Sequence, residues 1–388
     1  MANYPELIYW LALLNESRLK LNLVKPIIQQ WCFGENRSLA DLFQLSPWEW
    51  STRFGLSDED ANRAVAAAER LDKQAALVAQ WQSQKIEPLI RTDPRYPKRL
   101  IATLPGAKQP LILWARGNLN LLNEPGVAVL GGQAPDEATT ELIQEVMQTL
   151  AAEEINLVSG YGRGLDRATF ETMLTIPDGH AVTVLPMGLS AFAKSTAKLE
   201  PAIAQGRVTL ISPFAPDTPF QEKLAEARNL LIDHLALALL IPQPDDDAQV
   251  RGTAALERGQ PVFVSLNDTA GNRTLIDGGA YLLTDAGEVV EMVQQAIIDT
   301  VFVEEAPLPP IGQPAAAAPA PLVPLVTPAP AAAALSSDAD FSLPVEEVEP
   351  IDSEEALEIL SLGGNVPEIL RQRLKKEDGG EAKKKGKK

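Results

Sequence analysis

The stretch that decides the fold is Ile155-Asn156-Leu157-Val158-Ser159-Gly160-Tyr161-Gly162-Arg163-Gly164-Leu165-Asp166. It starts as a short apolar run over residues 155–158, passes through a loop with three glycines, and opens a helical stretch over residues 165–174. An apolar strand, a glycine-bearing turn and a helix make up one repeating unit of a parallel sheet. The stretch therefore predicts an α/β domain.

The same alternation continues on both sides of this unit. Strands are predicted at residues 127–130, 155–158, 181–185, 208–211, 235–241, 261–264 and 281–283. Helices are predicted at residues 136–152, 165–174, 194–204, 219–232, 252–258 and 286–298, with a helical turn near Thr274. Strands that are apolar throughout are covered on both faces, so we expect a Rossmann-like, doubly wound parallel sheet over residues 86–303.

The first part of the chain, residues 1–85, has helical patterns only. Residues 5–14 and 21–31 are periodic, with Pro26 expected near a helix start, and Ser38 and Ser57 are suited to cap helices. A small helical domain follows from this pattern. The six tryptophans gather towards this end and could stack on nucleobases, but we interpret them as core residues.

The C-terminal part divides by composition. Residues 304–350 begin rich in proline and alanine and then turn acidic, which is typical of a linker. Residues 351–388 combine a short helical segment with a lysine-rich end. We expect both segments to be largely disordered.

The net charge is −18, from 34 basic and 52 acidic side chains, and it is distributed unevenly. Residues 101–305 carry −15 of it, whereas residues 371–388 are basic with +6. Such an acidic sheet domain argues against a polyanionic partner. The single cysteine, Cys32, excludes an intramolecular disulfide framework. With neither an export signal nor a long apolar segment in this sequence, we expect a cytoplasmic protein that does not enter the membrane.

Three of the predicted strands end in glycine-bearing loops, and these are the candidate phosphate sites. They supply Gly131 and Gly132, then Ser159, Gly160 and Gly164, and finally Gly188. Glycines let a phosphate approach the backbone closely, and the amides at the following helix start point towards it. In the second loop Arg163 could grip a phosphate, while Asp166 could cap the helix or orient Arg163. The plainer interpretation is a tight turn with a helix cap and one surface arginine.

The order and spacing of several motifs resemble the DprA/Smf family of DNA-processing proteins. The matching stretches are residues 92–100, 110–117, the Gly131 loop, Ser159 to Asp166, Ala227-Arg228-Asn229, residues 255–264 and residues 271–280. The resemblance implies a Rossmann-like domain after a helical, SAM-like module. It also implies a homodimer that binds single-stranded DNA, assists a RecA-type recombinase in natural transformation, and has no catalytic reaction and no cofactor. On this resemblance Arg163, Arg167 and Arg228 are the best phosphate contacts, with Asn229 beside them; Arg251, Arg258 and Arg273 are weaker candidates.

The sequence departs from the family pattern at informative positions. Gln133, Leu230 and Gln260 stand where the family has arginines, and Asp246 and Asp247 replace small residues. The three lost arginines and the two gained carboxylates should all weaken anion binding in the pocket, and each lost phosphate contact should also reduce its salt dependence.

Two other functions remain open at this point. The sheet domain could bind a small nucleotide or nucleotide-derived signal, or it could serve as a scaffold that has lost DNA binding. Catalysis has the least support, because Ser159 has no histidine near it in the sequence. The run Asp245 to Asp247 lacks the spaced ligands of a calcium loop, so we expect no metal site and interpret it as a solvated turn.

Overall fold

The computed structural model describes residues 4–132, 135–266 and 269–303, and the side chains at 194–196 and 299–303 are not described. The predicted linker and tail, residues 304–350 and 351–388, therefore lie outside the described residues, as does Gln133.

The N-terminal part is helical, as the sequence predicts. Its helices are α1 (Glu6–Asn15), α2 (Leu21–Ile28), η1 (Gln29–Gly34), α3 (Leu39–Leu42), α4 (Pro47–Phe54), α5 (Asp58–Ala66), η2 (Ala67–Arg70) and α6 (Leu71–Ser83). Ser38 and Ser57 cap helices through their side chains, as predicted. The prediction for Pro26 was wrong, because this proline lies inside α2, which already starts at Leu21. Proline removes a backbone donor and crowds the preceding turn, and the next turn of this helix is the π-helical η1.

The tryptophans are core residues with one exception. Buried tryptophans are Trp10, Trp31, Trp50, Trp81 and Trp114. Trp48 is 73% exposed, so the core interpretation was wrong for this residue. It occupies the first turn of α4 directly after Pro47.

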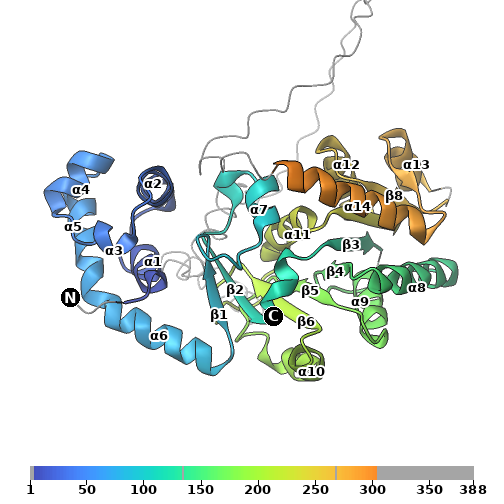
Figure 1. Cartoon of the computed structure of the whole chain (residues 1–388), viewed down its shortest axis with the longest axis horizontal. Helices are drawn as coiled ribbons and strands as arrows, with labels where there is room; N and C mark the ends of the chain where they lie inside the picture. Colours follow the sequence, from blue (N-terminus) through green and yellow to red (C-terminus); the bar gives the residue numbers. More distant parts are fainter. Residues whose placement is uncertain (1–3, 133–134, 267–268, 304–388) are drawn as a thin grey trace, which may run out of the picture.

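The second part is built on one sheet, which in the described chain has nine strands in the order β1-β2-β6-β5-β4-β3-β7-β8-β9 (Figure 1). The strands are β1 (Glu87–Ile90), β2 (Ile112–Gly117), β3 (Gly126–Gly131), β4 (Asn156–Ser159), β5 (Ala181–Val184), β6 (Val208–Ser212), β7 (Ala238–Gln243), β8 (Val262–Val264) and β9 (Tyr281–Leu282). From β6 to β9 across the sheet all neighbours are parallel, which confirms the doubly wound, Rossmann-like prediction.

Alternating strand residues feed two apolar cores, one on each face of the sheet. Val127, Val129 and Leu157 point into the core beneath α8 (Glu137–Ala152), α9 (Leu165–Thr175), α10 (Ala193–Ala204) and α14 (Ala286–Val303). Ala128 and Val158 point into the opposite core, which is covered by α7 (Lys98–Thr103), α11 (Lys223–Leu235), α12 (Asp246–Glu257) and α13 (Ala270–Asp277). Both faces of the sheet are therefore buried, which explains why its strands are apolar without alternation.

Several features of the sheet domain, helix α7 among them, were not predicted. Strands β1 and β2 were missed, and they join the sheet antiparallel at the edge beside β6. Helix α12 begins at Asp246 and not at Gly252, because the side chain of Asp245 accepts a hydrogen bond from the Ala248 amide and caps it. The solvated turn expected at residues 245–247 is consequently an exposed helix start.

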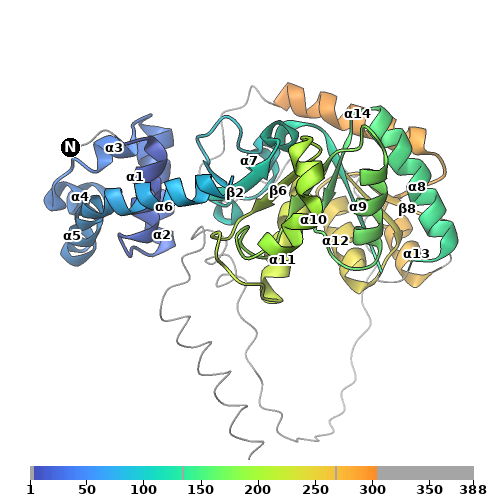
Figure 2. The ribbon, with the colours of Figure 1, turned by 90° about the horizontal axis from the view of Figure 1, so that it is seen from below.

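The helical part packs on the sheet edge formed by β1 and β2. Helix α6 leads directly to this edge (Figure 2), and Trp81 meets Trp114 of β2 edge-on with ring centroids 4.5 Å apart. Lys25 of α2 reaches the other side of the junction and donates to the carbonyl oxygens of Ala107 and Gln109. Burial, with a contribution from Arg91, lowers the pKa of Lys25 to about 8.

The end of α11 carries a buried histidine that makes stability depend on pH. Burial, together with the nearby Arg258, Arg99 and Lys108, lowers the pKa of His234 to about 3. The unfolded chain protonates this imidazole near pH 6.5, so acid favours unfolding progressively between pH 6.5 and 3. Lowering the pH from 7.5 to 5 should cost about 2 kcal/mol through this group. Urea unfolding at both pH values should show that loss, and His234→Gln should reduce it; an equal loss in the variant would contradict the assignment.

Among the described residues no helix is long and apolar enough to span a membrane.

Candidate functional site

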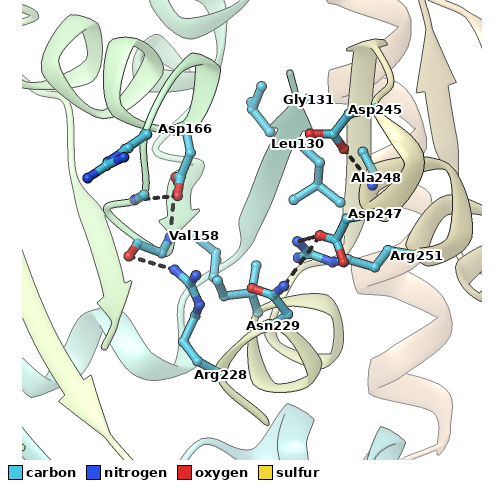
Figure 3. A pocket seen from close by; sticks show the side chains of 15 residues that line it. Leu130, Gly131, Val158, Asp166, Arg228, Asn229, Asp245, Asp247, Ala248 and Arg251 are labelled. Carbon is cyan, nitrogen blue, oxygen red and sulfur yellow. Dashed lines mark hydrogen bonds and ion pairs between the residues drawn. The ribbon is translucent and has the colours of Figure 1, made fainter. Parts of the chain in front are cut away.

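A cleft of about 240 Å³ opens at the carboxyl ends of β3, β4 and β7 (Figure 3). After β3 the chain adds β4, β5 and β6 on one side and then returns to place β7 on the other side. Parallel sheets bind ligands at such a switch in strand order, because the loops at the carboxyl ends diverge there. The cleft therefore lies where the sequence analysis expected a ligand.

The glycine loop after β4 is folded around a carboxylate of its own helix. Asp166, in the first turn of α9, accepts hydrogen bonds from the Ser159 hydroxyl at 2.6 Å and from the amides of Gly160 at 3.2 Å and Gly162 at 2.7 Å. The amides that could have held a phosphate are thus occupied by Asp166. Among the described residues Asp166 forms no ion pair with Arg163, so it shapes the loop rather than orienting this arginine.

Arg228 of α11 reaches the same loop from below. Its Nη1 donates to the Gly160 carbonyl oxygen at 2.7 Å, while its Nε is buried with no hydrogen-bond partner among the described residues. Burial lowers the pKa of Arg228, and the charge of Asp166 opposes that effect. A Cβ atom at position 160 would lie 1.6 Å from Nη1, so glycine is required here for the arginine to reach the cleft.

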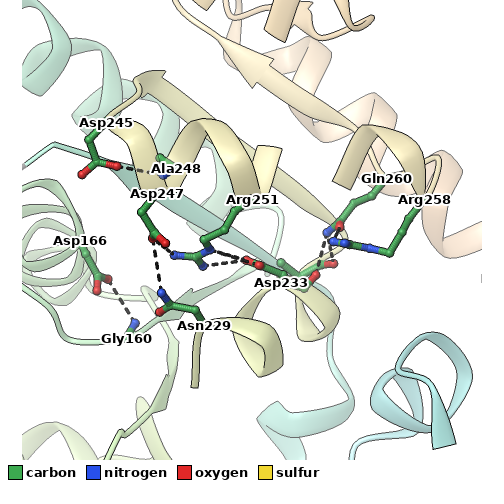
Figure 4. A network of polar contacts seen from close by, with 11 residues as sticks. Gly160, Asp166, Asn229, Asp233, Asp245, Asp247, Ala248, Arg251, Arg258 and Gln260 are labelled. Carbon is green, nitrogen blue, oxygen red and sulfur yellow. Dashed lines mark hydrogen bonds and ion pairs between the residues drawn. The ribbon is translucent and has the colours of Figure 1, made fainter. Parts of the chain in front are cut away.

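The other wall of the cleft is acidic, and its arginine is already paired. Arg251 of α12 binds Asp233 of α11 at 2.7 Å and Asp247 at 3.3 Å (Figure 4). Burial disfavours the charge of Arg251, but Asp233 and Asp247 outweigh this and raise its pKa. Asn229 joins the network by donating to Asp247 at 3.4 Å. Arg251, a weaker candidate from the sequence, is therefore part of the wall and not a free cation.

The charged groups that line the cleft balance formally. Three arginines, Arg163, Arg228 and Arg251, face three aspartates, Asp166, Asp245 and Asp247. Of the arginines, Arg163 is exposed at the crest of the loop. Of the two carboxylates that replace small residues of the family pattern, Asp247 lines the cleft and Asp246 does not, while Asp245 and Ala248 line it without having been predicted.

The predicted site residues are only partly brought together. Gly131, Gly160, Arg163, Asp166, Arg228 and Asn229 line the cleft. The remaining ones do not line it: they are Gly132, Ser159, Gly164, Arg167 and Gly188. Gly188 packs against the carbonyl oxygens of Ala215 and Pro216, and an added Cβ would lie 2.0 and 2.2 Å from them. This close backbone contact explains why position 188 requires glycine.

Gln260 does not belong to the cleft. It is buried before β8, at the opposite edge of the sheet, where it donates to the carbonyl oxygens of Asp233 and Ala236 and accepts from Arg258. The prediction that Gln260 marks a lost phosphate contact was therefore wrong, and Arg258 likewise does not line the cleft. Arg273 lies exposed on α13 and does not line the cleft either. Leu230 packs against the apolar core on its face of the sheet.

Comparison with known proteins gives consistent relatives. The chain is 28% identical to protein Smf of Escherichia coli over 225 residues, covering 55% of this chain and 59% of that protein. It is 29% identical to the DNA processing protein DprA of Streptococcus pneumoniae over 189 residues, covering 47% of this chain and 66% of that protein. The chain thus spans about three fifths of the length of the curated relatives it matches.

The fold agrees with a solved relative. The X-ray structure of DprA from Streptococcus pneumoniae superposes with a TM-score of 0.57 at 24% identity, covering 75% of this chain and 98% of that one. The family model described as DNA recombination-mediator protein A matches residues 87–294, which is more than half of the 388 residues. The match runs from β1 into α14 and includes every residue that lines the cleft. The chain belongs to the family of DNA recombination-mediator protein A, the DprA/Smf family.

Proposed function

We propose that this chain binds single-stranded DNA at the cleft between β3, β4 and β7, with Arg163 and Arg228 as its phosphate contacts. Family membership supports a role in DNA processing. The observation that carries the site is the position of these two arginines, one exposed on the loop crest and one held at Gly160, at the ligand-binding edge of the sheet. The proposal assigns binding and no chemical reaction to the cleft.

The biological setting is part of the same proposal. The family resemblance implies a cytoplasmic homodimer. It also implies that this homodimer helps to load a RecA-type recombinase on incoming DNA during natural transformation. The contacts within one chain support only the DNA site. The proposal for the partner and for the dimer rests on the family.

A gel shift with single-stranded oligonucleotides at low and moderate salt tests the binding. We expect retention of the single strand at low salt and weaker retention at moderate salt, because a few arginines act against the −18 charge of the chain. A double-stranded oligonucleotide of the same sequence is the comparison. Lack of any binding to the single strand at low salt would refute the proposed function.

Gly160→Ala should weaken DNA binding without unfolding the protein. The new Cβ would overlap the end of the flexible Arg228 side chain, which can swing away, so the guanidinium leaves its place at the loop; the contact of this Cβ with Asp166 Oδ2, at 3.1 Å, needs a shift of only a few tenths of an ångström. We expect roughly a tenfold loss of affinity, as for one lost charged contact. Gly132→Ala is the matched control, since its Cβ would meet nothing within 4 Å. Equal affinity of the Gly160→Ala variant and the wild type would argue against Arg228 as a contact.

A small nucleotide is the second candidate ligand, and the balanced charge of the cleft favours it. Three aspartates facing three arginines repel a long polyanion more than a ligand that reaches only Arg163 and Arg228. A thermal shift with a panel of mononucleotides separates the two functions. Stabilisation by a mononucleotide, with no dependence on oligonucleotide length, would favour the small ligand.

A further inference from the structure

The glycine loop after β4 contains one bulky residue in a backbone conformation that suits glycine. Tyr161 lies between Gly160 and Gly162 and has φ 53°, in the left-handed region. A non-glycine residue in this region is strained, and such strain gathers at functional sites. The loop therefore holds an aromatic side chain where glycine would be easier to accommodate.

The ring of Tyr161 is held rigidly by its neighbours. It meets Phe170 of α9 edge-on at 5.0 Å between ring centroids, and Phe192 at 5.8 Å. Both phenylalanines are buried, whereas Tyr161 remains partly exposed. The ring is thus fixed at the surface by contacts with the core beneath it.

The guanidinium of Arg167 lies over this ring. Its guanidinium carbon is 3.4 Å from the ring centroid, and its Nη2 donates to the Tyr161 carbonyl oxygen at 3.0 Å. That bond helps to hold the guanidinium over the ring. Arg167 was predicted as a phosphate contact, but it does not line the cleft and its geometry is that of a stacking partner.

We propose that Tyr161 and Arg167, stacked on each other, form a platform on which one nucleobase of single-stranded DNA stacks. Tyr161 is on the same loop as Arg163, and Arg167 follows in the first turn of α9, so a strand whose phosphates contact Arg163 passes beside the platform. Aromatic rings and arginine planes bind bases of any identity, because every base has a π face. Stacking also adds affinity without adding positive charge, which suits a cleft whose formal charges cancel. This inference rests on the proposed DNA-binding function.

The test compares a thymidine oligonucleotide with an abasic oligonucleotide of the same length, by fluorescence anisotropy at fixed salt. The wild type should bind the thymidine strand roughly tenfold more tightly. Tyr161→Leu should lose this preference while the slope of affinity against salt stays unchanged, and Tyr161→Phe should keep it. Arg167→Lys keeps the charge but not the plane, and should lose much of the preference.

The outcomes distinguish a failure of the stacking platform from a failure of the proposed DNA-binding function. If the wild type binds both strands equally, or if Tyr161→Leu retains the preference, the platform is refuted while the phosphate contacts stand. If Arg167→Lys binds like the wild type and Arg167→Ala flattens the salt slope, Arg167 contacts a phosphate and does not stack. If the wild type binds neither strand, the proposed function fails and the platform with it. Thermal unfolding of each variant checks that it is folded.

Discussion

Asp233→Ala is expected to lower the free energy of unfolding by about 3–5 kcal/mol. The Asp233 side chain is only 8% exposed and forms two hydrogen bonds with Nε and a third with Nη2 of Arg251, whose side chain is 13% exposed. Removing one member of a buried pair leaves the other charge buried without compensation. The free-energy cost of that uncompensated charge exceeds the net stabilisation that the intact pair provides. Urea unfolding at pH 7 measures the loss.

The same arginine offers a matched control. Asp247→Ala removes the other carboxylate that contacts Arg251, but this carboxylate is 63% exposed and 3.3 Å away, so we expect a loss below about 1 kcal/mol. The double variant Asp233→Leu with Arg251→Met should recover much of the stability that Asp233→Ala loses, since no charge remains buried. Similar losses of unfolding free energy for Asp233→Ala and Asp247→Ala would show that the buried pair of Asp233 with Arg251 does not stabilise this side of the cleft.

Asp166→Ala is expected to cost about 2–4 kcal/mol of stability and to weaken DNA binding. Its carboxylate accepts from Ser159, Gly160 and Gly162, and each buried donor left without a partner costs about 1–3 kcal/mol, less where water can replace the lost acceptor. The loop would also lose the group that fixes its shape, and with it the position of Arg163. Thermal unfolding and a gel shift on the same preparation measure both effects.

Asp245→Ala separates the loss of shape from the loss of charge. Asp245 also lines the cleft, but within the described part of the chain it accepts from a single amide, as the cap of α12, so its removal should cost about 1 kcal/mol. Both variants remove one negative charge from the cleft. We expect Asp245→Ala to bind DNA slightly more tightly and Asp166→Ala to bind it more weakly. The same direction in both variants would mean that charge alone governs the cleft.

The sequence predicts the fold better than the site, and particular residues show why. The loops after β3 and β4 could be found, because glycines directly follow apolar runs there. Strand order cannot be read from such runs, so these runs alone do not show that Asp245 and Asp247 share a cleft with Arg163 and Arg228. The pairing of Arg251 with Asp233 is a contact between two helices, and no local sequence pattern predicts it.

Two errors could have been avoided from the sequence itself. Gln260 precedes a predicted strand, and the start of a parallel strand lies at the edge opposite to the cleft. Asp166 comes only a few residues after Gly160 and Gly162, which is close enough for its carboxylate to accept hydrogen bonds from their amides. These amides therefore need no external anion. Strand β1 is hard to recognise because its four residues include Pro88, whereas β2 lies largely in the apolar run Leu111 to Ala115, which has a clear strand pattern and was missed.

The salt dependence of single-stranded DNA binding tests most directly whether the cleft contacts phosphates through Arg163 and Arg228. Affinity should be measured between low and moderate salt for the wild type, for Arg163→Ala with Arg228→Ala, and for Arg258→Ala as a control at the opposite edge of the sheet. Each phosphate contact on a single strand contributes about 0.7 to the slope of log affinity against log salt. We expect the double variant to lose about 1.4 of that slope and the control to lose none. An unchanged slope in the double variant would contradict the assignment of the cleft.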